Sequence, residues 1–132
     1  QEHGVDMNDL SQDLWMSNAQ LRYLNDRGHM VGLHSYSHPT TLAELSHEKQ
    51  REEYQSNYQH IHSVCGRVPV VMAHPVNSYS EETVNILSKL GIRCGFRSNT
   101  VPPHTGGQLN PNQYEMARED HSNILRLVRD SR

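Results

Sequence analysis

The alternation of short apolar runs with longer helical segments constrains the fold of this chain more than any other sequence feature. Three apolar runs predict strands, at Met30–Leu33, Val68–Met72 and Ile92–Phe96. The middle run is continuously apolar and rich in valine, as expected of a strand buried on both faces. A further short strand is expected within Asn112–Ala117, after a loop at residues 101–112 that is rich in proline and glycine.

Four segments around these runs have the spacing, serine caps or glycine stops of helices. They are Asp9–Arg27, Ser46–Val64, Ser80–Leu90 and His121–Val128. Strands that alternate with helices predict parallel βαβ units, and therefore an α/β fold rather than a helical bundle or a sandwich.

The composition predicts one domain over residues 1–132 with a thin core. The apolar fraction is 34%, compared with roughly 45–50% in typical globular proteins. Such a chain is expected to be part of a larger fold, or to bury surface against a partner such as a second copy. The net charge of −3 and the absence of a basic stripe argue against nucleic acid and anionic membranes as partners.

Two cysteines, Cys65 and Cys94, lie in separate segments and predict buried free thiols rather than a disulfide scaffold. No run of the sequence is long and apolar enough for a membrane span, and no signal peptide opens it. A cytoplasmic location is the expectation from these features.

Two histidines four residues apart, His34 and His38, follow the first predicted strand directly. Neutral imidazole is the commonest side-chain metal ligand, so the pair predicts half of a metal site, with zinc as the default and cobalt or nickel as alternatives. Pro39 disfavours helical geometry at His38 and predicts an extended conformation there. The chain has ten histidines, so a chance pair is the alternative, as expected for His60 and His62 on a polar helix.

A second polar loop follows the second predicted strand at Ala73–Tyr79. Pro75 stiffens this loop, and the backbone N–H of Val76 could point at a ligand oxygen, as in the oxyanion holes of acyl-transfer enzymes. Asn77 and Tyr79 offer polar contacts to a hydroxyl-rich substrate. The alternative is an ordinary turn. Because reactive loops gather at the carboxyl ends of parallel strands, both loops and the segment after Phe96 are expected on one rim.

These residues together resemble the polysaccharide deacetylase family, the NodB-homology carbohydrate esterases, over roughly residues 10–126. The block Gly28–Pro39 resembles the family's second motif, and the resemblance implies that His34 and His38 ligate a divalent metal. Ala73–Tyr79 resembles the third motif, with Val76 in the place whose N–H contacts the acetyl oxygen. Segments Gly91–Arg97 and Arg118–Leu125 resemble a branch associated with sugar biosynthesis. The expected substrate-binding residues are His74, Pro75, Val76, Asn77, Tyr79 and Arg118.

The sequence departs from the family pattern at its first motif, Thr-Phe-Asp-Asp, which supplies the third metal ligand and the general base. Asp6, Asp9 and Asp13 lie upstream of the histidines, but none follows an apolar strand. The family fold is a distorted (β/α) barrel that is normally longer than this chain, so an N-terminal portion is expected to be missing. The usual leucine-x-histidine motif near the C-terminus is not evident either.

His121, preceded by Asp120, is the late histidine placed to act as an Asp-oriented general acid. The alternative is that Glu119 and Asp120 are favourable charges at a helix start. The resemblance implies metal-assisted hydrolysis of an N-acetyl group on a sugar, with little activity in this chain because the aspartate base is absent. Two other hypotheses are a non-catalytic carbohydrate-binding domain and a structural domain whose histidines share a buried hydrogen-bond network.

Overall fold

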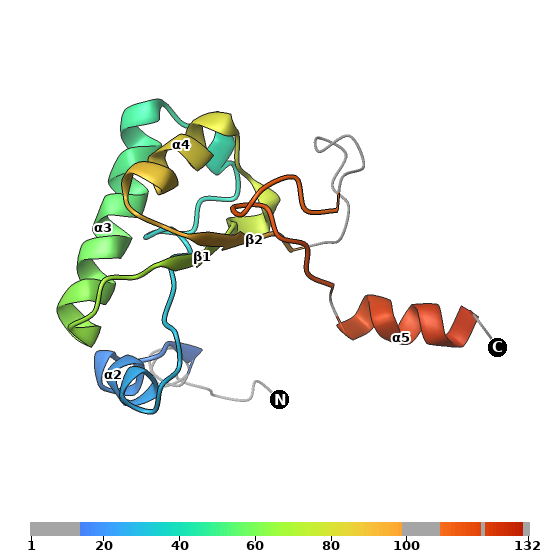
Figure 1. The fold of residues 1–132 in the computed structure, drawn as a ribbon, viewed down its shortest axis with the longest axis horizontal. Coiled ribbons are helices and arrows are strands. Elements are labelled where there is room, and N and C mark those ends of the chain that lie inside the picture. The colour runs from blue at the N-terminus through green and yellow to red at the C-terminus, as the bar shows by residue number, and fades with distance from the viewer. Residues whose placement is uncertain (1–13, 99–108, 120, 131–132) are drawn as a thin grey trace, which may run out of the picture.

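A computed structural model describes residues 14–98, 109–119 and 121–130. The elements in order are α2 (Asn18–Asp26), η1 (Leu42–Glu44), α3 (His47–Cys65), β1 (Val71–Ala73), η2 (Pro75–Asn77), α4 (Glu81–Lys89), β2 (Cys94–Phe96) and α5 (His121–Asp130). Figure 1 shows their arrangement. Asp6, Asp9, Asp13, Asp120 and most of the predicted loop at residues 101–112 lie outside the described residues.

Serine side chains start three of these helices. Ser17 and Gln20 form a reciprocal capping box, so α2 begins at Asn18 rather than continuing the helix that was predicted from Asp9. Ser80 caps α4 as expected, and Ser46 caps α3 in the same way.

The strands are parallel, as predicted, but shorter than the apolar runs that contain them. β1 pairs with β2 in register from Val71–Cys94 to Ala73–Phe96. The predicted strand Met30–Leu33 is reduced to a single parallel bridge between Leu33 and Met72, and the one expected in 112–117 to a bridge between Met116 and Phe96. Both segments lie at the edges of the described sheet, where a strand has a partner on one side only.

Close approach of the backbone at these two edges depends on glycine. A Cβ at Gly32 would lie 2.7 Å from the carbonyl oxygen of Val71, and one at Gly95 would overlap the carbonyl group of Tyr114. Glycine therefore lets each edge segment pair with its neighbour.

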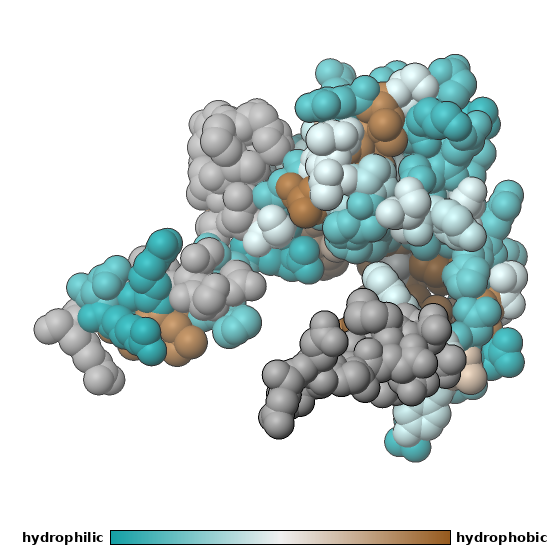
Figure 2. Space-filling view, turned by 180° about the vertical axis from the view of Figure 1, so that it is seen from behind, coloured by the Kyte–Doolittle hydropathy of each residue, from teal (hydrophilic) through white to brown (hydrophobic). Residues whose placement is uncertain are grey.

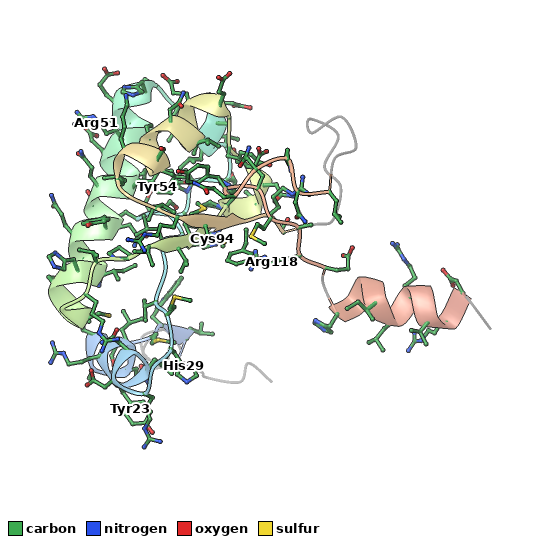
Figure 3. All side chains as sticks on the ribbon, in the orientation of Figure 1. Tyr23, His29, Arg51, Tyr54, Cys94 and Arg118 are labelled. Atoms are coloured by element: carbon green, nitrogen blue, oxygen red, sulfur yellow. The ribbon has the colours of Figure 1, made fainter. Side chains whose placement is uncertain are left out.

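Helices α3 and α4 pack on each other and cover one side of the sheet (Figure 1). Tyr54 points from α3 into the space between these helices and the strands (Figure 3). The core on this side consists of Leu33, Leu42, Tyr54, Ile61, Met72, Ile86, Leu87 and Ile92. Val71 and Ala73, which alternate with buried Met72, are only half-buried. The prediction that this strand is buried on both faces was therefore wrong for the described residues: helices cover one face only.

A buried polar bridge joins the two covering helices. The Thr83 hydroxyl donates to Oε1 of Gln50 at 2.6 Å, and Nε2 of Gln50 donates to the carbonyl of Leu45 at 2.9 Å. Gln50 and Thr83 are both fully buried. Because each polar group has a partner, the bridge fixes how the helices pack without leaving a buried donor unsatisfied.

Helix α5 extends away from the sheet and its covering helices (Figure 1). It carries the exposed apolar side chains Ile124, Leu125 and Val128, and in the space-filling view brown residues lie beside teal ones on it (Figure 2). Within the described ranges, no helix has the length and apolar character needed to cross a bilayer. Cys65 and Cys94 are free, as predicted, but half-buried rather than buried.

Candidate metal and substrate site

Hydrogen bonds connect the loops at the carboxyl ends of the strands into one rim. Nδ1 of His34 lies 2.8 Å from the carbonyl oxygen of Ala73 at the end of β1. Asn77, in the loop after β1, accepts from the N–H of Ser98 after β2 at 2.6 Å. Each loop therefore contacts the next, which agrees with the expected convergence on one edge.

The two candidate metal ligands lie together on this rim. Their ring centroids are 4.9 Å apart with an interplanar angle of 56°, and both side chains are exposed. Because a carbonyl oxygen can only accept, Nδ1 of His34 must carry the proton toward Ala73. The Nε2 lone pair of a neutral His34 ring is then left for a ligand, as in most metal-binding histidines. Exposure of both rings also argues against a buried histidine network.

The backbone of the His34–His38 loop differs from the sequence expectation. His38 has a φ of 57° and Ser35 a φ of 61°, so His38 is left-handed rather than extended. Pro39 does exclude the right-handed α conformation, as predicted, but hydrogen bonds within the loop select the left-handed one. The N–H of His38 donates to Oγ of Ser35 at 3.1 Å.

Two residues of α3 that were not singled out from the sequence hold this loop. The carboxylate of Glu53 accepts from Tyr36 and Ser37, and Oδ1 of Asn57 accepts from the N–H of His34 at 2.9 Å. Partial burial raises the pKa of Glu53, but the hydrogen bonds from Ser37 and Tyr36 outweigh it and lower that pKa below its ordinary value. The signal in the sequence is their i, i+4 spacing on one face of a predicted helix.

The second loop contains the most strained backbone of the site. Val76 has a φ of 43° and Asn77 a φ of 59°. Positive φ is costly for a β-branched residue and usually marks a functional constraint. Val76 is 55% exposed, so burial of its own side chain does not explain the conformation. Val76 lies in this turn, and its oxyanion role stays a prediction.

Three of the predicted substrate-binding side chains are buried instead of facing solvent. His74 is 1% exposed, Tyr79 is 8% exposed, and their rings stack at 3.8 Å. Nε2 of His74 lies 2.8 Å from the carbonyl of Tyr114, and the Tyr79 hydroxyl donates to Glu115 at 2.8 Å. Pro75, between them in the sequence, is buried as well. This differs from the direct sugar contact expected from the sequence.

Burial also makes one of these side chains an unusually weak acid. It raises the pKa of Tyr79 far above the ordinary value, and the hydrogen bond to Glu115 adds to the effect. The Tyr79 hydroxyl is therefore expected to act as a neutral donor to Glu115 at neutral pH.

Arg118 lies just after Met116, which forms the parallel bridge with Phe96. Its Nε donates to the carbonyl of Arg97 at 2.6 Å, and its guanidinium carbon lies 6.0 Å from the centroid of the Phe96 ring. Figure 3 shows it beside the segment that follows β2. Its side chain remains exposed, so a substrate contact stays a prediction for Arg118. Arg97, fully buried beneath it, was not predicted.

The proposed acid, His121, opens α5, which extends away from the strands (Figure 1). The structure does not bring it to the imidazole pair, and Asp120 lies outside the described residues. Their catalytic roles stay predictions.

The donor set fits two coordination positions of a divalent metal. Two exposed imidazoles, one oriented by a backbone carbonyl, are the kind of ligand that zinc, cobalt and nickel share. Among the described residues, no three His, Cys, Asp or Glu side chains come together in a way that could hold a metal ion. A third ligand is therefore not supplied by the part of the chain described.

The fold and site define a parallel α/β protein with a histidine pair at the carboxyl rim of its strands. The family model for polysaccharide deacetylases matches residues 3–95, more than half of the chain. The chain belongs to the polysaccharide deacetylase family. A search of curated proteins gave no match.

Solved structures of similar fold include a Streptococcus pyogenes deacetylase, PplD, in complex with acetate. It is 18% identical with a TM-score of 0.67, over 84% of this chain and 50% of that one. A Streptomyces lividans family 4 carbohydrate esterase in complex with acetate is 18% identical, with a TM-score of 0.57 over 84% of this chain and 62% of its own. The expected fold, part of a NodB-type (β/α) barrel, is confirmed.

A pseudoenzyme of the same family from Bacillus anthracis, BA3943, also has this fold. It is 19% identical with a TM-score of 0.57, over 86% of this chain and 46% of that one. The chain spans about half the length of these structures, from 46% to 62%.

Proposed function

We propose that this chain contributes the metal-binding and oxyanion loops of a carbohydrate deacetylase that hydrolyses an N-acetyl group on a sugar. One observation carries the proposal. The hydrogen bond of 2.8 Å from Nδ1 of His34 to Ala73 leaves Nε2 for a ligand, beside His38 and on the same rim as the strained turn at Val76.

The reaction adds water to the acetyl carbonyl carbon and breaks the C–N bond, which gives acetate and a free amine. A divalent cation, zinc by default, would polarise the carbonyl and lower the pKa of a bound water. The backbone N–H of Val76 would stabilise the oxyanion of the tetrahedral intermediate, because a donor fixed by a strained turn needs no reorganisation. His121 remains the predicted acid that protonates the leaving amine.

A metal titration tests the histidine pair. We expect wild-type protein to bind cobalt(II) or zinc, and His34→Ala to weaken binding at least about tenfold, since His34 supplies one of two visible ligands. His62→Ala is the matched control, because His62 is an exposed histidine on α3. A wild-type chain that binds no metal, or an equal loss in the His62 variant, would contradict the proposal.

Deacetylation by the chain alone is expected to be weak or absent, because a catalytic zinc site ordinarily uses three protein ligands. Release of acetate from N-acetylglucosamine oligomers, measured with and without added zinc, checks this. Turnover comparable to that of a complete deacetylase would contradict this expectation. It would mean that residues of this chain outside the described ranges supply the third metal ligand and the general base.

A non-catalytic carbohydrate-binding domain is the second candidate. The described residues lack a third metal ligand, and one structure of similar fold is a pseudoenzyme. Binding of chitin oligomers without acetate release, unchanged by His34→Ala, would favour this candidate over the hydrolase.

A further inference from the structure

The carboxylate of Glu53 uses both of its oxygens on the loop between the two histidines. Its Oε2 accepts the N–H of Tyr36 at 2.9 Å and the N–H of Ser37 at 2.8 Å. Its Oε1 accepts the hydroxyl of Ser37 at 2.6 Å. Three donors on one carboxylate form a strong, charge-assisted contact.

The loop needs such support because its backbone is unfavourable by itself. Ser35 and His38 both have positive φ, and each left-handed residue of this kind costs about 1–2 kcal/mol. The bond from His34 to Asn57, one turn after Glu53 on α3, anchors the start of the loop. Glu53 anchors its middle, between the two rings.

We propose that Glu53 is a positioning residue that holds the His34–His38 loop in the conformation in which both imidazoles can bind one metal ion. This inference rests on the proposed function, because it gives the loop a metal-binding task. Glu53 itself touches neither imidazole in this role; it acts through the backbone of Tyr36 and Ser37. Without it, the two positive-φ residues would relax and the rings would separate.

The neighbouring Glu52 shows what an ordinary surface glutamate on the same helix does. Its carboxylate pairs with Lys49 at 3.0 Å, with both side chains more than half exposed. Exposed pairs of this kind contribute little to stability. Glu52→Gln therefore makes the same charge change one residue away, without touching the histidine loop.

The first test needs no metal. Glu53→Gln keeps the size of the side chain but removes its negative charge, so one neutral amide oxygen accepts from the loop in place of two carboxylate oxygens and the charge-assisted bonds are weakened. We expect amide hydrogen exchange at Tyr36 and Ser37 to speed up at least about tenfold, since these bonds protect the loop. Nitrogen NMR should also show loss of the Nδ1-protonated form of His34. Glu52→Gln should leave both signals unchanged.

The second test measures cobalt(II) affinity of the same variants. Glu53→Gln should raise the Kd about tenfold or more, as loss of outer-shell support does elsewhere, with Glu52→Gln at the wild-type value. Ser37→Ala removes only the hydrogen bond from the Ser37 hydroxyl. It should raise the Kd and speed up the exchange by less than Glu53→Gln does, and it replaces Glu53→Gln as the test if that variant fails to fold.

The two proposals fail separately. Unchanged exchange and an unchanged His34 signal in Glu53→Gln would overturn the positioning role, whatever the metal does. Faster exchange with an unchanged cobalt Kd would overturn it too. Failure of wild-type protein to bind cobalt would instead overturn the proposed function.

Discussion

At the residue scale, the site depends on side chains that stabilise unfavourable backbone. Val76 and Asn77 on one loop, and Ser35 and His38 on the other, all have positive φ. None is glycine, so each conformation needs support from its surroundings: the side chains of α3 hold the histidine loop, and the Val76 turn lies between the stacked residues His74 and Tyr79. Strain of this kind persists only where the surrounding structure enforces it, and it is found most often at functional sites.

Val76→Gly should therefore stabilise the protein. Releasing a strained positive φ gains about 1–3 kcal/mol, and the extra freedom of glycine in the unfolded chain costs about 0.5–1 kcal/mol. We expect a net gain of about 1 kcal/mol in the free energy of unfolding, measured by urea denaturation. Val68→Gly is the control, because Val68 is equally exposed, at 54%, without a positive φ; it should destabilise. A loss of stability in Val76→Gly would show that the valine side chain holds the turn.

At the scale of elements, α3 both covers the sheet and anchors the histidine loop. Its apolar stripe includes Tyr54 and Ile61, which are both buried, as the sequence predicted. Glu53 and Asn57, on the adjoining face of the helix, hold the loop. The packing of α3 on α4 therefore sets where the site lies, and the bridge between Gln50 and Thr83 fixes that packing.

Breaking this bridge on one side should be costly. Thr83→Val removes the hydroxyl that donates to Gln50 and that accepts the N–H of Ser80 in the cap of α4. It leaves the buried oxygen of Gln50 without its partner, which typically costs about 1–3 kcal/mol. The double variant Gln50→Leu, Thr83→Val should recover part of that loss, since neither polar group then remains. Chemical denaturation of all three variants gives the coupling energy. Ser88→Ala, at an exposed position of α4, should be nearly neutral, and strict additivity of the two substitutions would argue against the bridge.

At the scale of the whole molecule, the described sheet is covered by helices on one side and open on the other. Val71, Ala73, Cys94 and Phe96 are only half-buried, whereas Leu33 and Met72 are buried in the core. The chain spans about half the length of the similar solved structures. The low apolar fraction agrees with a core that is built from one side.

The pH dependence of stability also belongs to this scale. Burial, and then the charge of Glu53, raises the pKa of Tyr54 above its ordinary value of 10.0, and burial does the same for Tyr79. A raised folded-state pKa contributes stability that is fully present below pH 10 and is lost as the pH rises beyond it. Urea denaturation from pH 8 to 11 should show this fall.

Tyr79→Phe should fall less steeply with pH than the wild type above pH 10, because one raised phenol is gone. Tyr23→Phe, at a tyrosine that is 56% exposed, is the control for removing a phenol from the surface. At the acid end the sign reverses: the lowered pKa of Glu53 contributes stability above its ordinary value of 4.5, and this is lost as the pH falls. A Tyr79 variant with the wild-type alkaline slope would contradict the assignment.

Local chemistry in the sequence was enough to predict the parallel α/β class, the serine-capped helices, the histidine pair and the turn at Val76. Apolar periodicity, N-caps and the order of strands and helices are properties of neighbouring residues, and they survive into the folded chain. Strand lengths could not be predicted, because Met30–Leu33 pairs only where Val71 offers a partner. The residues that support the loops could not be predicted either. Glu53 is hydrogen-bonded to Ser37, 16 residues away in the sequence, and Glu115 to Tyr79, 36 residues away. Contacts between distant segments decide which polar residue supports which loop, and only the tertiary structure brings those segments together.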